Sequence, residues 1–567
     1  MWNFRYDVGE ECNKLLDEAV SVAELNIRLC RNLSIDVSWI TCEGYPFEVN
    51  FPIAAPTPPP EMHRQVFATI ATILEEVEGS DGITVNVFLP KGDDLRNDTR
   101  TAEMAPFLQS IVRSSAIEQM TIAVNPCDSP NGRVMDTHRN DATGPTDDFQ
   151  LVTAVATNLA SPQSIVKKLT LQKIHFDNEL LATLCGSISS RQCPLVKLKL
   201  HECQYLTLGP LWSALAENKS IENLVLCHLG MNQPSSDDWY GPQELQSMLS
   251  TNTTMTDLSL VGVGSCFPNS FYTALGAGLA SNTTLNMLDL SGATPGYDEC
   301  YVAALFEGGL DRHIGLEKFC LEIFDWEATQ EFVSGMDRMA KNIAAKRSAD
   351  GSHRVSKLNN LLLRFSWEGM FVDCANLTLD CFVRNRACFK LGEFHLDSQK
   401  DEEEEPPLLD AYHFTKLAAF IQAFPTLTIL TVFTSRDAID DDSHLKVLAD
   451  TLENHTTMTW LEIGRFDTTI DLFWVRDWSA ADNPNRAHIL CSIVRNKREL
   501  PVFWESNKTN LVPLALVTLL KPSSSDLENV VNLTHAFRLV QNLPDLFSTD
   551  GGSGGGSGGE KVESVES

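Results

Sequence analysis

Histidine, cysteine and acidic side chains are the residues of this chain that could carry catalysis or bind a metal, but their spacing argues against both. The 13 His and 15 Cys are scattered, with no Cys-x-x-Cys pair and no Cys/His group at zinc spacing. No glycine-rich phosphate loop, Gly-x-Ser-x-Gly elbow or His-Glu-x-x-His motif occurs. The acidic runs at 401–405 and 440–442 lack the spacing of a calcium loop. We therefore predict a non-enzymatic protein without a metal or a cofactor.

Two groups of side chains instead suit protein recognition. Alternate residues of a β-strand point to opposite faces, so the residues between the inward-facing apolar positions line the other, concave face of the predicted strands. The early group is basic within an acidic chain and consists of Lys168, Lys197, Lys199 and His201. The late group combines apolar, aromatic and cationic side chains, as interface hot spots do, and consists of Leu362, Arg364, His395, Ile429, Phe433 and Trp460. We predict that both groups contact a protein partner.

Each group also has a structural explanation. Acidic side chains on neighbouring strands would neutralise the lysines without any partner. C-terminal helices that include Phe503 and Trp504 would cover Phe433 and Trp460 as a cap. A lone strand histidine is typical of an ordinary packing or surface residue, so the histidines of both groups allow this interpretation too.

The strands that position these residues come from a sequence repeat. In the segment SNTTLNMLDLSG, 281–292, an Asn-Thr turn leads into Leu-x-x-Leu-x-Leu, and a helical pattern at 270–280 precedes it. Insertions at 125–148 and 326–353 lengthen two of the units. One unit cannot bury three apolar strand residues, so successive strands must stack as a parallel sheet with helices on one face. The first apolar position recurs about every 34 residues at Ile117, Val166, Leu195, Ile221, Met255, Leu285, Leu316, Leu358, Leu391, Leu427 and Met458.

An asparagine recurs three residues ahead of the first strand position, at Asn218, Asn252 and Asn282, and each begins an Asn-x-Ser/Thr sequon. A turn from helix to strand favours asparagine because this residue tolerates the left-handed backbone conformation. We therefore attribute these sequons to repeat geometry and not to glycosylation.

The register resembles the leucine-rich repeats of the ribonuclease-inhibitor type over about residues 83–466. The resemblance implies an α/β solenoid with parallel strands on the concave face, helices on the convex face, and a protein-binding function. Two features depart from it. The units exceed the ~20–29 residues of the class, and the usual Asn or Cys three residues after the last strand leucine is clear only at Cys203.

Four segments follow from the repeat pattern and the composition. Residues 1–82 form an atypical N-terminal cap, and residues 83–466 form a solenoid of about eleven units. Residues 467–548 form a mostly helical C-terminal cap. The Gly/Ser-rich segment 549–567 cannot bury apolar surface and is predicted to be a flexible tail.

The formal net charge of −32 bears on the kind of partner. It repels nucleic acid and anionic lipid and favours a basic protein, although the same charge could serve only to keep a long, leucine-rich surface soluble. No apolar run approaches the ~20 residues of a membrane helix, the N-terminus does not read as a signal peptide, and several cysteines fall on core positions of the repeat. We therefore expect a cytoplasmic protein, with the nucleus as the alternative, and the sequence leaves its oligomeric state open.

Two other functions fit repeats of this kind. The GTPase-activating protein of Ran is similar in having about eleven repeats and strong acidity, but this chain lacks the regular Asn-bearing repeat and the long acidic C-terminal run expected there. A ubiquitin-ligase substrate receptor would need an F-box-like N-terminal module, which residues 2–42 do not obviously supply. A non-enzymatic protein-binding scaffold remains the preferred interpretation.

Overall fold

A computed structural model divides the chain into two compact units, Met1–Pro407 and Leu408–Ser567. Phe433, the predicted C-terminal cap and the Gly/Ser tail lie outside the described residues, as do Phe503 and Trp504. The described residues are 2–4, 34–38, 71, 83–90, 98–125, 147–204, 206–229, 240–262, 267–292, 301–346, 355–365, 371–398, 411–432 and 442–463.

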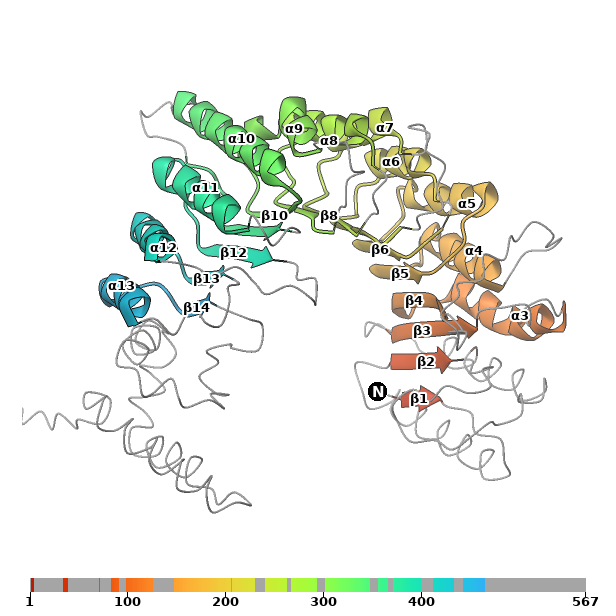
Figure 1. Ribbon diagram of the computed structural model, residues 1–567. Helices are drawn as coiled ribbons and strands as arrows, with labels where there is room; N and C mark the ends of the chain where they lie inside the picture. Colours follow the sequence, from red (N-terminus) through yellow and green to blue (C-terminus); the bar gives the residue numbers. More distant parts are fainter. Residues whose placement is uncertain are drawn as a thin grey trace, which may run out of the picture. The chain divides into compact units, whose positions relative to one another are not determined.

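The described strands of the first unit form one parallel sheet in which each strand pairs with its neighbours in chain order (Figure 1). They are β1 (Trp2–Phe4), β2 (Ser34–Ser38), β3 (Ile83–Pro90), β4 (Ile117–Asn125), β5 (Lys168–Gln172), β6 (Lys197–His201), β7 (Asn223–Cys227), β8 (Asp257–Val261), β9 (Met287–Leu290), β10 (Lys318–Ile323), β11 (Asn360–Phe365) and β12 (Glu393–Ser398).

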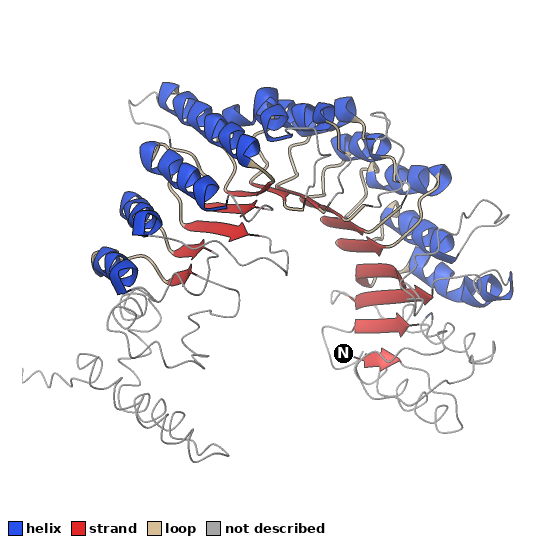
Figure 2. Ribbon diagram, in the orientation of Figure 1, coloured by secondary structure: helices blue, strands red, loops and turns tan. Residues whose placement is uncertain are grey.

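Helices alternate with these strands from β3 onwards, and Figure 2 shows them along one side of the sheet. This confirms an α/β fold with a single parallel sheet and alternating helices, built like a solenoid. Strands β1 and β2 add to the sheet within the segment predicted as a cap. The helices are α3 (Asp98–Arg113), α4 (Asp147–Leu159), α5 (Asn178–Ile188), α6 (Leu208–Glu217), α7 (Pro242–Thr251), α8 (Asn269–Ser281), α9 (Tyr301–Gly308), the 3-10 turn η3 (Leu310–Arg312), α10 (Trp326–Ala345) and α11 (Phe371–Arg384).

The second unit contains two parallel strands and two helices among its described residues. Helix α12 (Ala411–Ala423) precedes β13 (Ile429–Val432), and α13 (Asp442–Glu453) precedes β14 (Trp460–Ile463). Strand β13 pairs with β14 so that Ile429 lies opposite Trp460. The order of helix then strand is that of the first unit, as the repeat predicts.

The predicted repeat register defines the core of both units. All eleven first positions are buried, and none is more than 3% exposed. The third apolar residue of the same motif is likewise buried, as at Leu171, Leu200, Leu226 and Leu290. Burying a leucine side chain of this kind contributes ~1.5–3 kcal/mol, so each repeat of the register adds to the apolar driving force for stacking the units.

The recurrent asparagines join neighbouring units, for a reason that differs from the predicted one. Asn218, Asn252 and Asn282 have φ between −69° and −73° and an extended backbone, so the left-handed conformation is not what selects them. Each is buried. In Asn282, Oδ1 accepts the N–H of Thr284 (2.9 Å) and Leu285 (2.7 Å), while Nδ2 donates to the carbonyl of Leu249 in the preceding unit (2.7 Å). Asparagine is therefore favoured because its amide satisfies buried backbone groups on both sides.

Left-handed residues occur instead directly after the strands. The φ values are 58° at Lys173, 52° at Glu202, 48° at His228, 55° at Gly262 and 70° at Gly292. The N–H groups of Lys173, Glu202 and His228 donate to the carbonyl of the last residue of the next strand at 2.8 Å, and the N–H of Gly262 donates to the carbonyl of Ser291, just after β9, at 2.9 Å. This series of hydrogen bonds ends at Gly292, whose N–H donates to the carboxylate of Glu322 instead of to a carbonyl. The structure thus repeats one backbone turn at the carboxyl edge of five successive strands.

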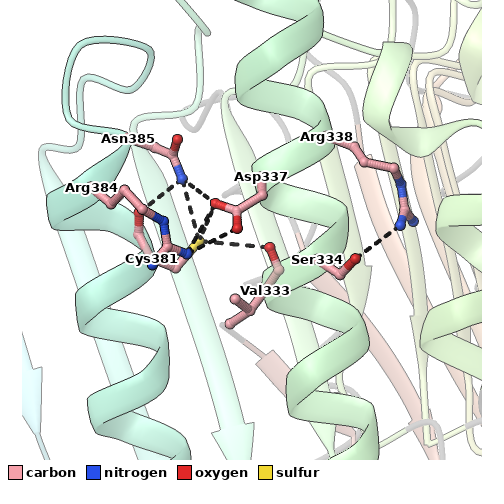
Figure 3. Close-up of polar contacts among 7 residues, drawn as sticks. All are labelled: Val333, Ser334, Asp337, Arg338, Cys381, Arg384 and Asn385. Atoms are coloured by element: carbon pink, nitrogen blue, oxygen red, sulfur yellow. Dashed lines mark hydrogen bonds and ion pairs between the residues drawn. The ribbon is translucent and has the colours of Figure 1, made fainter.

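Helices α10 and α11 are joined by polar contacts to one carboxylate (Figure 3). Asp337 of α10 accepts hydrogen bonds from Arg384 Nη2 (2.9 Å to Oδ2) and from the side-chain amide of Asn385. The Cys381 thiol lies in the same contact, 3.6 Å from Asp337 Oδ1. Asp337 therefore holds the end of α11 against the middle of α10.

Candidate functional site

The sheet register assembles three rows of side chains on the face opposite the helices of the first unit. We call this face, made by alternate residues of β5 to β12, the open face. The first row is Lys168, Lys197, Asn223, Asp257, Met287, Lys318, Asn360 and Glu393. The second row is Thr170, Lys199, Val225, Ser259, Asp289, Cys320, Leu362 and His395. The third row contains Gln172, His201, Cys227, Val261, Glu322, Arg364 and Asp397.

Three lysines of the early group form a basic patch on β5 and β6. Lys168 is exposed and lies opposite Lys197 in the register, and Lys199 lies opposite Thr170; Lys197 and Lys199 are half-buried. Within the described part of the chain, no carboxylate forms an ion pair with these three lysines, whereas nearby Lys173 pairs with Glu202 at 3.3 Å. Among the residues that the structure describes, the patch therefore presents positive charge that no carboxylate pairs.

His201, the fourth member of the early group, ends β6 and behaves differently. Burial lowers the pKa of its imidazole, an effect that the carboxylate of Glu202 opposes and that Lys199 reinforces. Its Nδ1 lies 3.5 Å from Oε1 of Glu202. His201 is consequently neutral at pH 7 and adds no charge to the basic patch.

The middle of the open face carries acidic side chains held by hydroxyl groups. Asp289 accepts hydrogen bonds from the Oγ of Ser259 (3.2 Å) and from the Oγ of Ser291 (2.6 Å). Asp257 accepts one from Oγ1 of Thr256 at 2.6 Å. These fixed carboxylates lie next to the basic patch, so the face changes sign between β6 and β8.

The late group belongs partly to the first unit, where it includes an ion pair that the sequence did not reveal. Arg364 Nε donates to Oδ2 of Asp397 on the neighbouring strand at 3.0 Å. Leu362 lies opposite His395 in the register, and both are half-buried. Burial lowers the pKa of His395, against the raising effect of Glu393 and Asp397. This part of the face is therefore apolar with balanced charge.

The remaining members of the late group belong to the second unit. Ile429 and Trp460 lie opposite each other on β13 and β14, and both are half-buried. Their strand neighbours Leu430 and Leu461 are buried, so the predicted alternation holds here. Phe433 lies outside the described residues.

One group on the described part of the chain has the residue types and spacing to hold a metal ion. The ligand atoms of His201, Cys227 and His228 all lie within 4.8 Å of one another. A search for linear zinc motifs misses this group because the sheet, not the sequence spacing, brings His201 to Cys227. In the sequence, only the adjacency of Cys227 and His228 hints at this metal-binding group.

Neither a protein-family model nor a curated protein matches this chain. Among the helices that the structure describes, none has the length and apolarity to cross a membrane.

Proposed function

We propose that this chain is a non-enzymatic scaffold of the leucine-rich repeat type that binds a protein on its open face, in the cytoplasm or the nucleus. The register of the sheet carries this proposal, because it lines up alternate side chains of consecutive strands in three rows opposite the helices. Extended surfaces of stacked repeats are suited to contact with another macromolecule.

The charge distribution supports a protein partner of mixed charge. A net charge of −32 attracts a partner with net positive charge over a long range. The basic patch attracts carboxylates at short range, since Lys168, Lys197 and Lys199 have no ion-pair partner among the described residues. The complementary partner is therefore basic overall and places acidic side chains against β5 and β6.

The apolar part of the open face supplies the other element of an interface. Leu362 and His395 lie together and half-buried on β11 and β12, beside the balanced pair Arg364–Asp397. Interface cores are apolar and poor in unpaired charge, and charged residues lie around them. The open face has both kinds of surface.

Affinity capture from native cell extract, read by quantitative mass spectrometry, tests the proposal. The open-face variant is Lys197→Glu/Lys199→Glu, which reverses the charge of the basic patch. We expect this variant to retain at least ~10-fold less of the specific partner, because like charges placed opposite each other cost several kcal/mol.

The matched control makes the same change of charge away from the open face. Lys341 and Lys346 belong to α10 and its end and are exposed, so Lys341→Glu/Lys346→Glu should retain the partner as the wild type does. Equal loss in both variants would mean that net charge alone governs capture, and equal retention in both would contradict binding at the basic patch.

A further inference from the structure

His201, Cys227 and His228 bring three potential metal ligands together, an arrangement that protein binding does not require. Two imidazoles and one thiol converge, with all ligand atoms within 4.8 Å of one another. His201 is the last residue of β6, and Cys227 is the last residue of β7 and its Cα partner. The cluster therefore lies at the carboxyl edge of the open face.

The backbone turn after β7 brings the third side chain to this place. His228 has φ 48° and its N–H donates to the Val261 carbonyl at 2.8 Å, so its backbone is fixed. Its ring lies over Gly262, where an added Cβ would be 2.2 Å from His228 Nδ1. The rings of His201 and His228 meet edge to face, with centroids 5.7 Å apart. A glycine at position 262 thus leaves the space that the His228 ring occupies.

A buried ring nitrogen provides a second, independent observation. Nδ1 of His201 is buried and has no hydrogen-bond partner. A buried polar atom in this state costs free energy unless a ligand satisfies it. The Glu202 carboxylate lies 3.5 Å from this nitrogen but forms no hydrogen bond with it, so Nδ1 remains available to a ligand.

Charged groups of both signs surround the thiol. Two carboxylates, those of Glu202 and Asp289, and one amine, that of Lys199, interact electrostatically with Cys227. Lys173 is engaged by Glu202 at 3.3 Å.

We propose that His201, Cys227 and His228 bind one Zn²⁺ ion and leave its fourth coordination position open. Imidazole nitrogen and thiolate sulfur are the ligands that Zn²⁺ prefers, and three protein ligands are typical of open zinc sites. As the sulfur–zinc bond forms, the Cys227 thiol releases its proton to solvent. Zinc bonds of ~2.0–2.3 Å place tetrahedral ligands about 3.5 Å apart, so the cluster must close slightly, which the exposed side chain of His228 allows.

The site does not depend on the proposed protein-binding function. Zinc alone is the probe, and the full chain is titrated against a competing chromophoric chelator. Co²⁺ then replaces Zn²⁺ in a second titration, because a cobalt–thiolate bond gives a charge-transfer absorption that identifies a cysteine ligand. We expect one tight site per chain with this absorption.

Matched variants locate the site. Cys227→Ser and His228→Gln should each weaken Zn²⁺ binding at least ~100-fold, and Glu202→Gln, which changes a group beside a ligand, should weaken it ~10-fold. Cys320→Ser and His395→Gln alter the same residue types elsewhere on the open face and should leave the affinity unchanged. Zn²⁺ should also raise the melting temperature of the wild type and of both controls.

Two results would overturn the proposal. One is zinc binding that survives both Cys227→Ser and His228→Gln, which would assign it to acidic surface groups or to other thiols. The other is the lack of any tight site and of a cobalt–thiolate band in the wild type. Melting curves without metal show that each variant is folded, so a loss of affinity is read as loss of the ligand.

Discussion

At successive turns from helix to strand, a buried polar side chain joins one unit to the unit before it. Asn218, Asn252 and Asn282 do so through their amides. His313 takes the same place in the next unit, with Nδ1 2.9 Å from the Asn282 carbonyl and Nε2 3.0 Å from the Leu285 carbonyl. His455 does so in the second unit, where Nε2 lies 3.1 Å from the Phe424 carbonyl. Stacking therefore relies on hydrogen bonds as well as on leucines.

Replacing one of these asparagines should be costly. Asn282→Ala leaves the N–H of Thr284, the N–H of Leu285 and the carbonyl of Leu249 without their partner. We expect a loss of about 2–4 kcal/mol in the free energy of unfolding, measured by urea denaturation. Asn286→Ala, at a half-buried position of the same turn, should change it by less than about 0.5 kcal/mol. Equal effects would contradict the bridging role.

His313, which takes the place of the bridging asparagine in its unit, makes the free energy of unfolding depend on pH. Burial lowers the pKa of His313 from its usual value of 6.5, although carbonyls of the preceding unit oppose this and Lys346 reinforces it. The unfolded chain therefore takes up this proton first as the pH falls. The contribution of His313 is present above pH 6.5 and is lost below it.

His313→Asn should remove this part of the acid sensitivity, because asparagine bridges units in the neighbouring turns without titrating. The loss of unfolding free energy between pH 7.5 and pH 5.5 should be smaller in the variant than in the wild type. An identical loss in both proteins would show that His313 does not contribute to the pH dependence.

The residue scale also shows what the sequence could not reveal. The sequence periodicity was enough to predict the eleven buried first positions, from Ile117 to Met458, because the burial of a side chain depends on its position along its own strand. The pair Arg364–Asp397 and the cluster around Cys227 are joined across strands, and their sequence separation varies with helix and loop length. The recurrent asparagines were found by their spacing, but their role requires knowledge of the partner carbonyls.

At the scale of elements, several of the polar contacts between α10 and α11 meet at one carboxylate, that of Asp337. Asp337 is about one-third exposed and Arg384 about one-half, so this ion pair is partly screened by solvent. Asn385 and Cys381 share the same carboxylate. Removing Asp337 therefore affects more groups than removing Arg384 does.

Two alanine variants test this hierarchy. Asp337→Ala should lower the free energy of unfolding by about 1–2 kcal/mol, because it leaves partly buried donors without an acceptor. Arg384→Ala should lower it by no more than about 1 kcal/mol, as exposed ion pairs do. Urea denaturation measures both, and a larger loss in Arg384→Ala would contradict the assignment of Asp337 as the central group.

The strands and helices themselves were predictable because each strand motif follows a helical pattern in the sequence. Strands β1 and β2 were not, since neither lies in the eleven-unit register. The left-handed turns after the strands were missed as well, because three of the five, at Lys173, Glu202 and His228, do not use glycine. Non-glycine residues give no sequence signal for that conformation.

At the scale of the molecule, the open face is the surface that we propose for binding. The chain is strongly acidic, yet three lysines without an ion-pair partner among the described residues and a half-buried apolar area lie on this one face. Repeats whose helices cover only one side of a sheet leave the other side available to a partner.

Site-specific photocrosslinking in native extract tests this claim most directly. A benzophenone side chain is placed at Val225 or Leu362 on the open face, and at exposed helical positions, Ser213 of α6 and Lys341 of α10, as controls. We expect one protein to be crosslinked from Val225 and Leu362 and not from the two helical positions. Crosslinks to a specific partner from Ser213 or Lys341, with none from the open face, would contradict it.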